Sequence, residues 1–243
     1  MLYKRLLATL CTSSAIAFAP SISAETKLGW HGSGEAGFNQ RTGNTVSEST
    51  VARLRLGYKL ERIEYKSLLE IERKSENNDA TSERYVLDLQ SDLYFSEAKD
   101  NYGFINGRGE KDKFADLDSD LSMTVGLGRV LYRTEPTELK AELGLGYQEV
   151  RYIEDQPNNY EQTTGRVKLD LNHQFNETYS FAQDLLYTVG DKQYKLETNT
   201  GLRAALNSQL AISASYKYRY NSQPGEMAKK ADGETNLTLI YKF

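Results

Sequence analysis

The closing stretch of the chain, residues 235–243, alternates between apolar and polar positions with a period of two. From residue 237 onward every odd-numbered position is apolar and the last is aromatic, while the even-numbered positions are polar except for Ile240. Because side chains of a β-strand point alternately to opposite faces, this stretch has one apolar face and one largely polar face. Such a strand is typical of a lipid-facing barrel wall or of the edge of a soluble β-domain.

The same alternation recurs along the chain without a linker, which favours the barrel. Segment five alternates poorly, and the phase of segment six breaks at Arg129-Val130, which predicts a β-bulge or a tilt toward the turn. A tilted membrane strand needs roughly 9–11 residues, and a closed barrel satisfies every backbone group in lipid. We therefore predict an all-β transmembrane antiparallel barrel of twelve strands, with both termini periplasmic because the number is even. The twelve segments are 29–40, 49–60, 63–74, 84–95, 102–112, 120–132, 138–150, 162–175, 178–190, 193–206, 209–220 and 235–243.

The connections between these segments alternate in length. Those after segments 2, 4, 6, 8 and 10 are short turns, such as Glu61-Arg62 and Asn176-Glu177. Those after segments 1, 3, 5, 7 and 11 are longer and polar, and only Asp191-Lys192 after segment 9 breaks the rule. Outer-membrane barrels have short periplasmic turns and longer outer loops. We therefore expect residues 76–81, 153–159 and 221–233 to lie at the cell surface.

The first 24 residues have the layout of a secretory signal peptide. Lys4 and Arg5 precede an apolar run, and small residues up to Ala24 follow it. We predict cleavage after Ala24, which leaves one domain from residue 25 to 243; cleavage after Ala19 fits the small-residue rule but would leave Pro20 first. The single cysteine, Cys11, lies in the signal, so the mature chain needs no disulfide.

The charge balance argues against nucleic acid as a partner. The chain carries 30 Lys and Arg against 34 Asp and Glu, a net charge of −4. Removing the signal takes away two basic residues and no acids, so the mature chain is more acidic still. A nucleic-acid-binding domain needs a basic surface. The mean hydropathy of −0.63 also excludes a bundle of membrane-spanning helices.

Several short motifs along the chain carry a family resemblance. The most specific is the opening run from Trp30 to Asn39 followed by Thr42-Gly43-Asn44-Thr45, and others are Gln90–Phe95 and Glu110–Phe114. Together they resemble a bacterial family of salt-induced outer membrane proteins of unknown function. The resemblance covers essentially the whole mature chain and implies an outer-membrane location and a link to salt or acid stress. It carries no catalytic residues. The terminal Phe243 likewise resembles the last residue of outer-membrane barrels, which implies insertion by the barrel assembly machinery.

Enzymatic chemistry finds little support in the residues. An outer-membrane lipid hydrolase, the main alternative, would need a histidine near the outer leaflet. The two histidines, His31 and His173, fall near the periplasmic ends of their segments, His31 inward and His173 outward. The run Asp116–Asp120 has the first spacings of a calcium loop but lacks its glycine and closing glutamate. We predict no catalytic, cofactor or metal site.

The polar faces of the segments predict a charged lumen. Counting back from the turns places Arg53 and Arg55 beside Glu70 and Glu72, Lys168 opposite Asp184, and Glu197 opposite Arg219. The lumen-facing candidates are Arg53, Arg55, Lys66, Glu70, Glu72, Asp88, Asp92, Lys140, Glu142, Lys168, Asp170, Asp184, Glu197, Lys217 and Arg219.

Two interpretations of this lumen stay open. Eight strands leave a filled interior and sixteen an aqueous pore, so twelve lie between. The charges either pair into a network that fills the barrel, or they line a narrow and weakly selective channel. In both cases we expect a monomer whose partners are outer-membrane lipid and lipopolysaccharide.

Overall fold

The described part of the chain is built almost entirely of β-strands. The computed structural model describes residues 28–41, 47–77, 79–153, 159–225 and 228–243, so the predicted signal peptide and Glu25 lie outside it. Among the described residues no helix has the length and apolar character to cross a membrane. The strands are β1 (Gly29–Arg41), β2 (Ser47–Lys59), β3 (Ile63–Glu76), β4 (Asp79–Tyr94), β5 (Asn101–Asp112), β6 (Leu117–Arg133), β7 (Thr137–Tyr152), β8 (Tyr160–Gln174), β9 (Tyr179–Gly190), β10 (Tyr194–Ala205), β11 (Leu210–Asn221) and β12 (Ala231–Lys242), with a 3₁₀ turn η1 (Lys113–Ala115).

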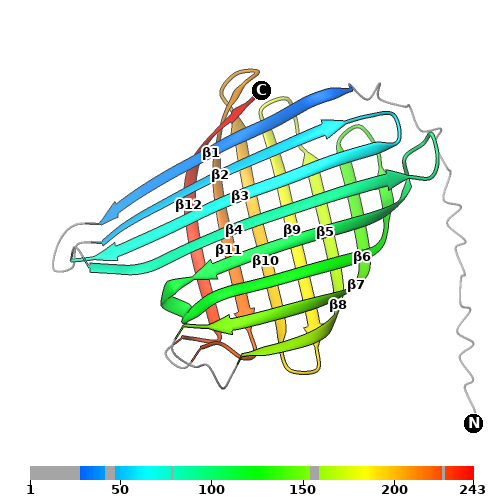
Figure 1. The fold of residues 1–243 in the computed structure, drawn as a ribbon. Coiled ribbons are helices and arrows are strands. Elements are labelled where there is room, and N and C mark those ends of the chain that lie inside the picture. The colour runs from blue at the N-terminus through cyan, green and yellow to red at the C-terminus, as the bar shows by residue number, and fades with distance from the viewer. Residues whose placement is uncertain (1–27, 42–46, 78, 154–158, 226–227) are drawn as a thin grey trace, which may run out of the picture.

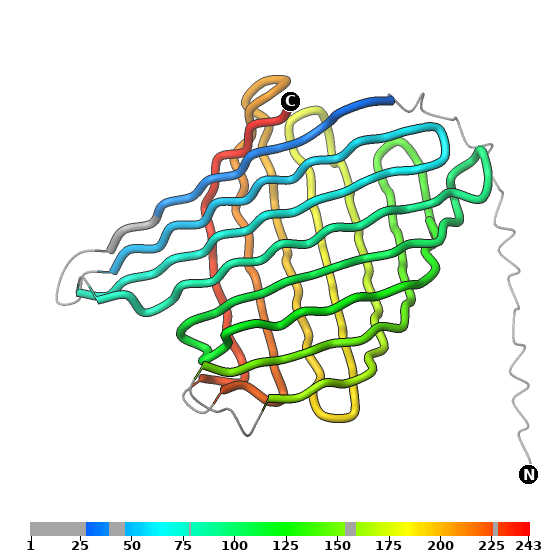
Figure 2. Tube along the Cα trace, viewed as in Figure 1, coloured from blue at the N-terminus to red at the C-terminus, as the bar shows by residue number. Residues whose placement is uncertain are grey.

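The strands form one closed antiparallel barrel, as predicted. Each pairs with its neighbour in sequence, and β12 returns to β1 (Figure 1). At this closure Ser33 lies opposite Lys242 and Ala36 opposite Leu239. Phe243 extends the seam, because its backbone exchanges hydrogen bonds of 2.9 and 3.0 Å with Gly32. The described start of β1 and the end of the chain therefore lie at the same rim, as the tube in Figure 2 also shows.

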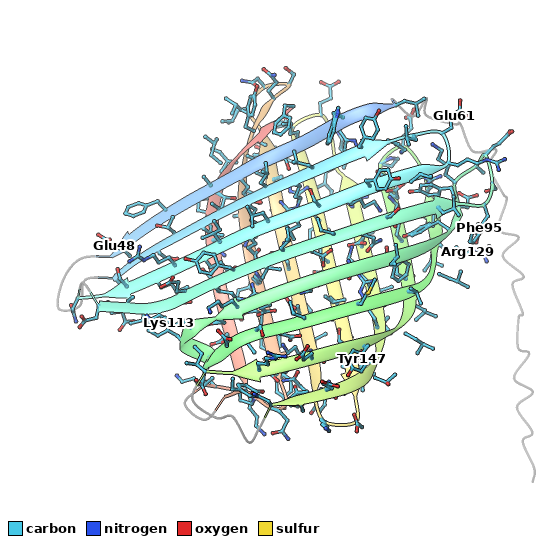
Figure 3. The ribbon with its side chains drawn as sticks, in the orientation of Figure 1. Glu48, Glu61, Phe95, Lys113, Arg129 and Tyr147 are labelled. Carbon is cyan, nitrogen blue, oxygen red and sulfur yellow. The ribbon has the colours of Figure 1, made fainter. Side chains whose placement is uncertain are left out.

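The outer wall of the barrel is an apolar belt. Large side chains such as Leu127, Leu143 and Leu145 are exposed on it, which a wall surrounded by water would not favour. Side chains cover this wall on all strands in view (Figure 3). Exposed aromatic side chains gather near both ends of the belt: Trp30, Phe95, Phe175 and Tyr179 at one end, and Phe38, Tyr85, Tyr147 and Tyr216 at the other.

Glycines on β6 and β7 make room for aromatic rings inside the barrel. Tyr102 and Phe104 of β5 are almost fully buried and point inward. A Cβ atom on Gly126 would lie 2.2 Å from the carbonyl oxygen of Leu143 and 2.7 Å from the ring of Phe104. Only a residue without a side chain fits there, because the clash involves backbone that cannot move aside.

Substitution of Gly126 by alanine is therefore expected to destabilise the barrel by roughly 1–3 kcal/mol, the usual cost of overpacking. Gly107 provides the matched control, since a Cβ atom there would meet no atom within 4 Å. Urea unfolding of both variants in detergent measures the difference. Equal stability of Gly126→Ala and Gly107→Ala would contradict the packing described here.

The strand phases were predicted correctly, but the alternation of connection lengths holds only in part, because the long loop predicted after segment three is absent. The turns at residues 60–62, 95–100, 134–136, 175–178 and 206–209 form one rim, the turn rim; the opposite loop rim includes connections as short as 77–78 and 191–193. Polar residues between 76 and 81 continue β3 and β4, with Glu76 opposite Asp79. A strand ladder needs only backbone groups, so it continues past the apolar belt. The bulge predicted in segment six is confirmed by a register shift between Val130 and Tyr132.

Candidate functional site

A cluster of buried ion pairs bridges the middle of the lumen. Arg84 on β4 donates to Glu70 and to Glu110, each at 2.7 Å. Arg53 on β2 donates to the same Glu70 at 2.6 Å and to Glu35 at 3.0 Å. Adjacent strands β1 to β5 thus supply alternating charges along one side of the bore. The Arg84 and Arg53 side chains are 1% and 3% exposed, so neither charge is solvated by bulk water.

The cluster extends across the bore to strands that are not neighbours of this side. Glu72 on β3 accepts from Lys217 at 2.8 Å and from Arg219 at 3.0 Å, both on β11. Arg108 on β5 donates to Glu197 on β10 at 2.7 Å. We name the central ionic cluster the set that these contacts join: Glu35, Arg53, Glu70, Glu72, Arg84, Arg108, Glu110, Glu197, Lys217 and Arg219.

A second polar group lies between this cluster and the turn rim. Glu142 on β7 accepts from Arg166 at 2.7 Å, from Gln90 at 2.8 Å and from Tyr102 at 3.0 Å. The guanidinium of Arg166 also lies over the Phe104 ring, 5.1 Å from its centre. Three donors from β4, β5 and β8 fix this carboxylate and restrain the β4–β8 wall here.

The loop rim is covered by the segment that leaves β11. Tyr152 of β7 donates from its hydroxyl to the carbonyl of Gln223 at 3.0 Å, and Gln193 donates to the same carbonyl at 2.9 Å. Further along, a Cβ atom on Gly225 would lie 2.5 Å from the carbonyl oxygen of Ala115 in η1. Because η1 joins β5 to β6, the segment reaches from β11 to strands across the barrel. Residues 222–225 therefore cross this mouth.

The free space of the lumen lies toward the turn rim. A cavity of about 670 Å³ is lined at its outer end by His31, Lys242 and Phe243, and at its inner end by Glu70 and Lys217 of the central ionic cluster. The cavity thus opens at the turn rim, and the ion pairs of the central ionic cluster close its inner end.

Comparison with known protein families identifies the family of this chain. The family described as "Protein of unknown function, DUF481" matches residues 34–243. The chain belongs to this family. A relative, the uncharacterized protein YdiY of Escherichia coli (strain K12), is 24% identical over 232 residues, which cover 90% of this chain and 86% of that protein.

Solved structures show the same fold in other sequences. The NanC porin superposes on the DUF481 barrel with a TM-score of 0.54 at 9% identity, over 88% of this chain and all of that one. The COG4313 outer membrane channel from Pseudomonas putida F1 gives a TM-score of 0.53 at 13% identity, over 93% and 100%. At such identities the likeness shows the fold alone.

The predicted lumen residues of the DUF481 barrel occupy inward positions, but their pairing differs in part. Arg53 does lie opposite Glu70, whereas Arg55 bonds Glu35 at 3.1 Å and neither predicted glutamate. Lys168 lies opposite Leu186, not Asp184. Five residues, 175–179, separate the paired residues Gln174 and Ser180, whereas a pairing of Lys168 with Asp184 requires only three.

Glu197 does lie opposite Arg219, yet both side chains turn toward other partners, Arg108 and Glu72. Other predicted residues lie nearer the turn rim. Lys140 meets Glu138 at 2.8 Å, Lys168 meets Asp170 at 2.9 Å, and Lys66 bonds Asp92. Asp88 lies 3.6 Å from Arg108, at the edge of the central ionic cluster.

Charged residues inside the DUF481 barrel that were not among the predicted lumen candidates include Glu35, Glu64, Arg84, Arg108, Glu110, Asp120, Arg166 and Lys195. Most of these residues lie on the polar face of their segments, so continuing the period-two alternation along each segment would identify them. Arg108 and Glu110 gave no such signal. On β5 the outward positions include Gly103, Gly107 and Gly109, so the apolar alternation is absent.

The two histidines lie at the turn rim, as predicted. His31 is 3.7 Å from Glu64, and His173 shares a 2.7 Å hydrogen bond with Thr137 and contacts the Phe175 ring edge-on. Neither contact pairs a histidine with a nucleophile near the loop rim. Among the described residues, no three His, Cys, Asp or Glu side chains gather to hold a metal ion.

Proposed function

We propose that the DUF481 barrel is an integral outer-membrane protein whose lumen is closed at rest by the central ionic cluster. The observation that carries this proposal is the set of bonds from Glu72 to Lys217 and Arg219, which join opposite walls of the bore. Paired charges on opposite walls obstruct a pore while they satisfy each other. The segment over the loop rim adds a second barrier. The protein therefore acts as a channel of low conductance and not as an open porin.

The apolar belt and its aromatic ends support the outer-membrane location. In this proposal the turn rim faces the periplasm and the signal peptide is removed after Ala24. The barrel is a monomer surrounded by lipid and lipopolysaccharide. The barrel assembly machinery inserts it through β12, whose end at Phe243 pairs with Gly32. The link to salt stress implied by the family resemblance belongs to the same proposal.

Surface labelling tests this orientation. An epitope tag within residues 153–159 is expected to label on intact cells, and a tag at Asn176-Glu177 only after the outer membrane is permeabilised. These sites lie at opposite ends of β8, so one strand carries both the test and its control. Labelling with the opposite pattern would invert the orientation, and recovery of the protein in the cytoplasmic fraction would refute the location.

A further inference from the structure

The cavity at the turn rim has the size of a ligand site. Its volume of about 670 Å³ falls within the range of roughly 300–1,000 Å³ that is typical of small-molecule pockets. Apolar side chains line part of its wall, including Leu68, Val86 and Leu186. Charged side chains supply the remainder. The sign of the exposed charges decides which class of molecule can bind in the cavity.

The exposed charges in this cavity are mostly positive. Three cations on β2, β3 and β8 each bond a carboxylate that lies deeper in the wall. Their side chains are 31–38% exposed, whereas the carboxylate partners are 0–19% exposed. The three pairs are Arg55 with Glu35, Lys66 with Asp92, and Lys168 with Asp170. The ammonium and guanidinium groups therefore face the open space, while the negative charges are covered.

We propose that this cavity binds a small organic anion with several carboxylates, which enters from the turn rim. A lysine ammonium has three donors and an arginine guanidinium five, so one carboxylate partner leaves donors unused in each pair. Carboxylates of a ligand would accept from these donors, and the apolar wall would contact its carbon skeleton. This inference deepens the proposed function by giving the class of solute, and it rests on the lumen being closed below the cavity.

Several acidic residues also line the cavity, and Asp184 is the one that tests the preference for anions. Asp184 lines the cavity and lies directly opposite Asp170 across the β8–β9 ladder. Asn199 donates to it at 3.4 Å. A bound anion would be repelled by Asp184, so its neutralisation should tighten anion binding. A cationic ligand would respond in the opposite direction to the same change.

Isothermal titration calorimetry of the folded barrel in detergent is the test, with citrate as the anionic probe and spermidine as the cationic one. Citrate is expected to bind with a Kd below about 1 mM, and spermidine more weakly. The double variant Lys66→Gln/Lys168→Gln should weaken citrate binding at least about tenfold, because it removes two charge-assisted contacts. Asp184→Asn should tighten it.

The control is Lys111→Gln, which removes an exposed lysine paired with Asp118 near the loop rim and should leave citrate binding unchanged. Heat-modifiable gel mobility verifies that each variant is folded. The proposal would be overturned if spermidine bound more tightly than citrate, or if citrate did not bind at concentrations several times higher than about 1 mM. An unaltered citrate affinity in the double lysine variant would also overturn it. The assay measures neither location nor conductance, so an open channel that still binds citrate would refute only the closed lumen.

Discussion

Replacement of Arg84 by glutamine is expected to lower the free energy of unfolding by about 3–5 kcal/mol, the usual cost of removing one partner from a buried ion pair. Arg84 is 1% exposed and lies within 4 Å of four carboxylates: Glu70, Glu72, Glu110 and Glu197. Without the guanidinium these buried acids would repel one another. Urea unfolding in detergent, followed by gel mobility, measures the loss.

Arg151→Gln is the matched control. This arginine also pairs with a carboxylate, Glu149, but its side chain is 60% exposed, and such surface pairs contribute about 0–1 kcal/mol. Arg84→Lys, which keeps the positive charge, should recover part of the stability, but it loses the planar guanidinium that bonds Glu70 and Glu110 together. A loss in Arg84→Gln no greater than that in Arg151→Gln would show that the central ionic cluster does not hold the barrel together.

The double change Glu70→Gln/Glu72→Gln is expected to raise conductance severalfold and to shift selectivity toward anions. It leaves Arg53 with Glu35 and Arg84 with Glu110, but it removes both carboxylates that hold Lys217. Arg219 likewise loses Glu72. Unpaired charges in a narrow bore turn toward water, so the bore widens and becomes more positive. The reversal potential in a salt gradient across a planar bilayer reports the selectivity.

The variant Glu72→Gln/Lys217→Gln separates the effect of width from that of charge. It breaks the same bridge but removes one charge of each sign, so conductance should rise without a gain in anion preference. The same reversal potential in both double variants would contradict an electrostatic origin of the shift.

Most of the fold follows from local patterns in the sequence. The period-two alternation of β7, with Leu139, Leu143 and Leu145 outward, fixes its face because a slip of one residue would turn every apolar side chain inward. The same reasoning found the lumen-facing charges on β3, including Glu70 and Glu72. The lumen-facing charges of β5, Arg108 and Glu110, could not be identified in this way. Glycines occupy outward positions of β5, so the apolar half of the alternation is absent there.

The partners within the lumen could not be predicted in the same way. Glu72 and Lys217 are 145 positions apart and meet only because the barrel closes through β12 and β1. Register across one turn predicted Arg53 beside Glu70, yet it failed for Lys168 because the β8–β9 ladder starts at Gln174 and Ser180, two positions beyond the predicted register. The crossing of Gln223 toward Tyr152 depends on a loop without periodicity, so no sequence pattern indicates it.

Single-channel recording of the unmodified barrel in a planar bilayer tests the closed lumen most directly. The central ionic cluster predicts a small conductance for the wild type and a clear increase when Glu70 and Glu72 are both neutralised. A large and steady wild-type conductance that does not change with these two residues would contradict the closure of the bore by paired charges.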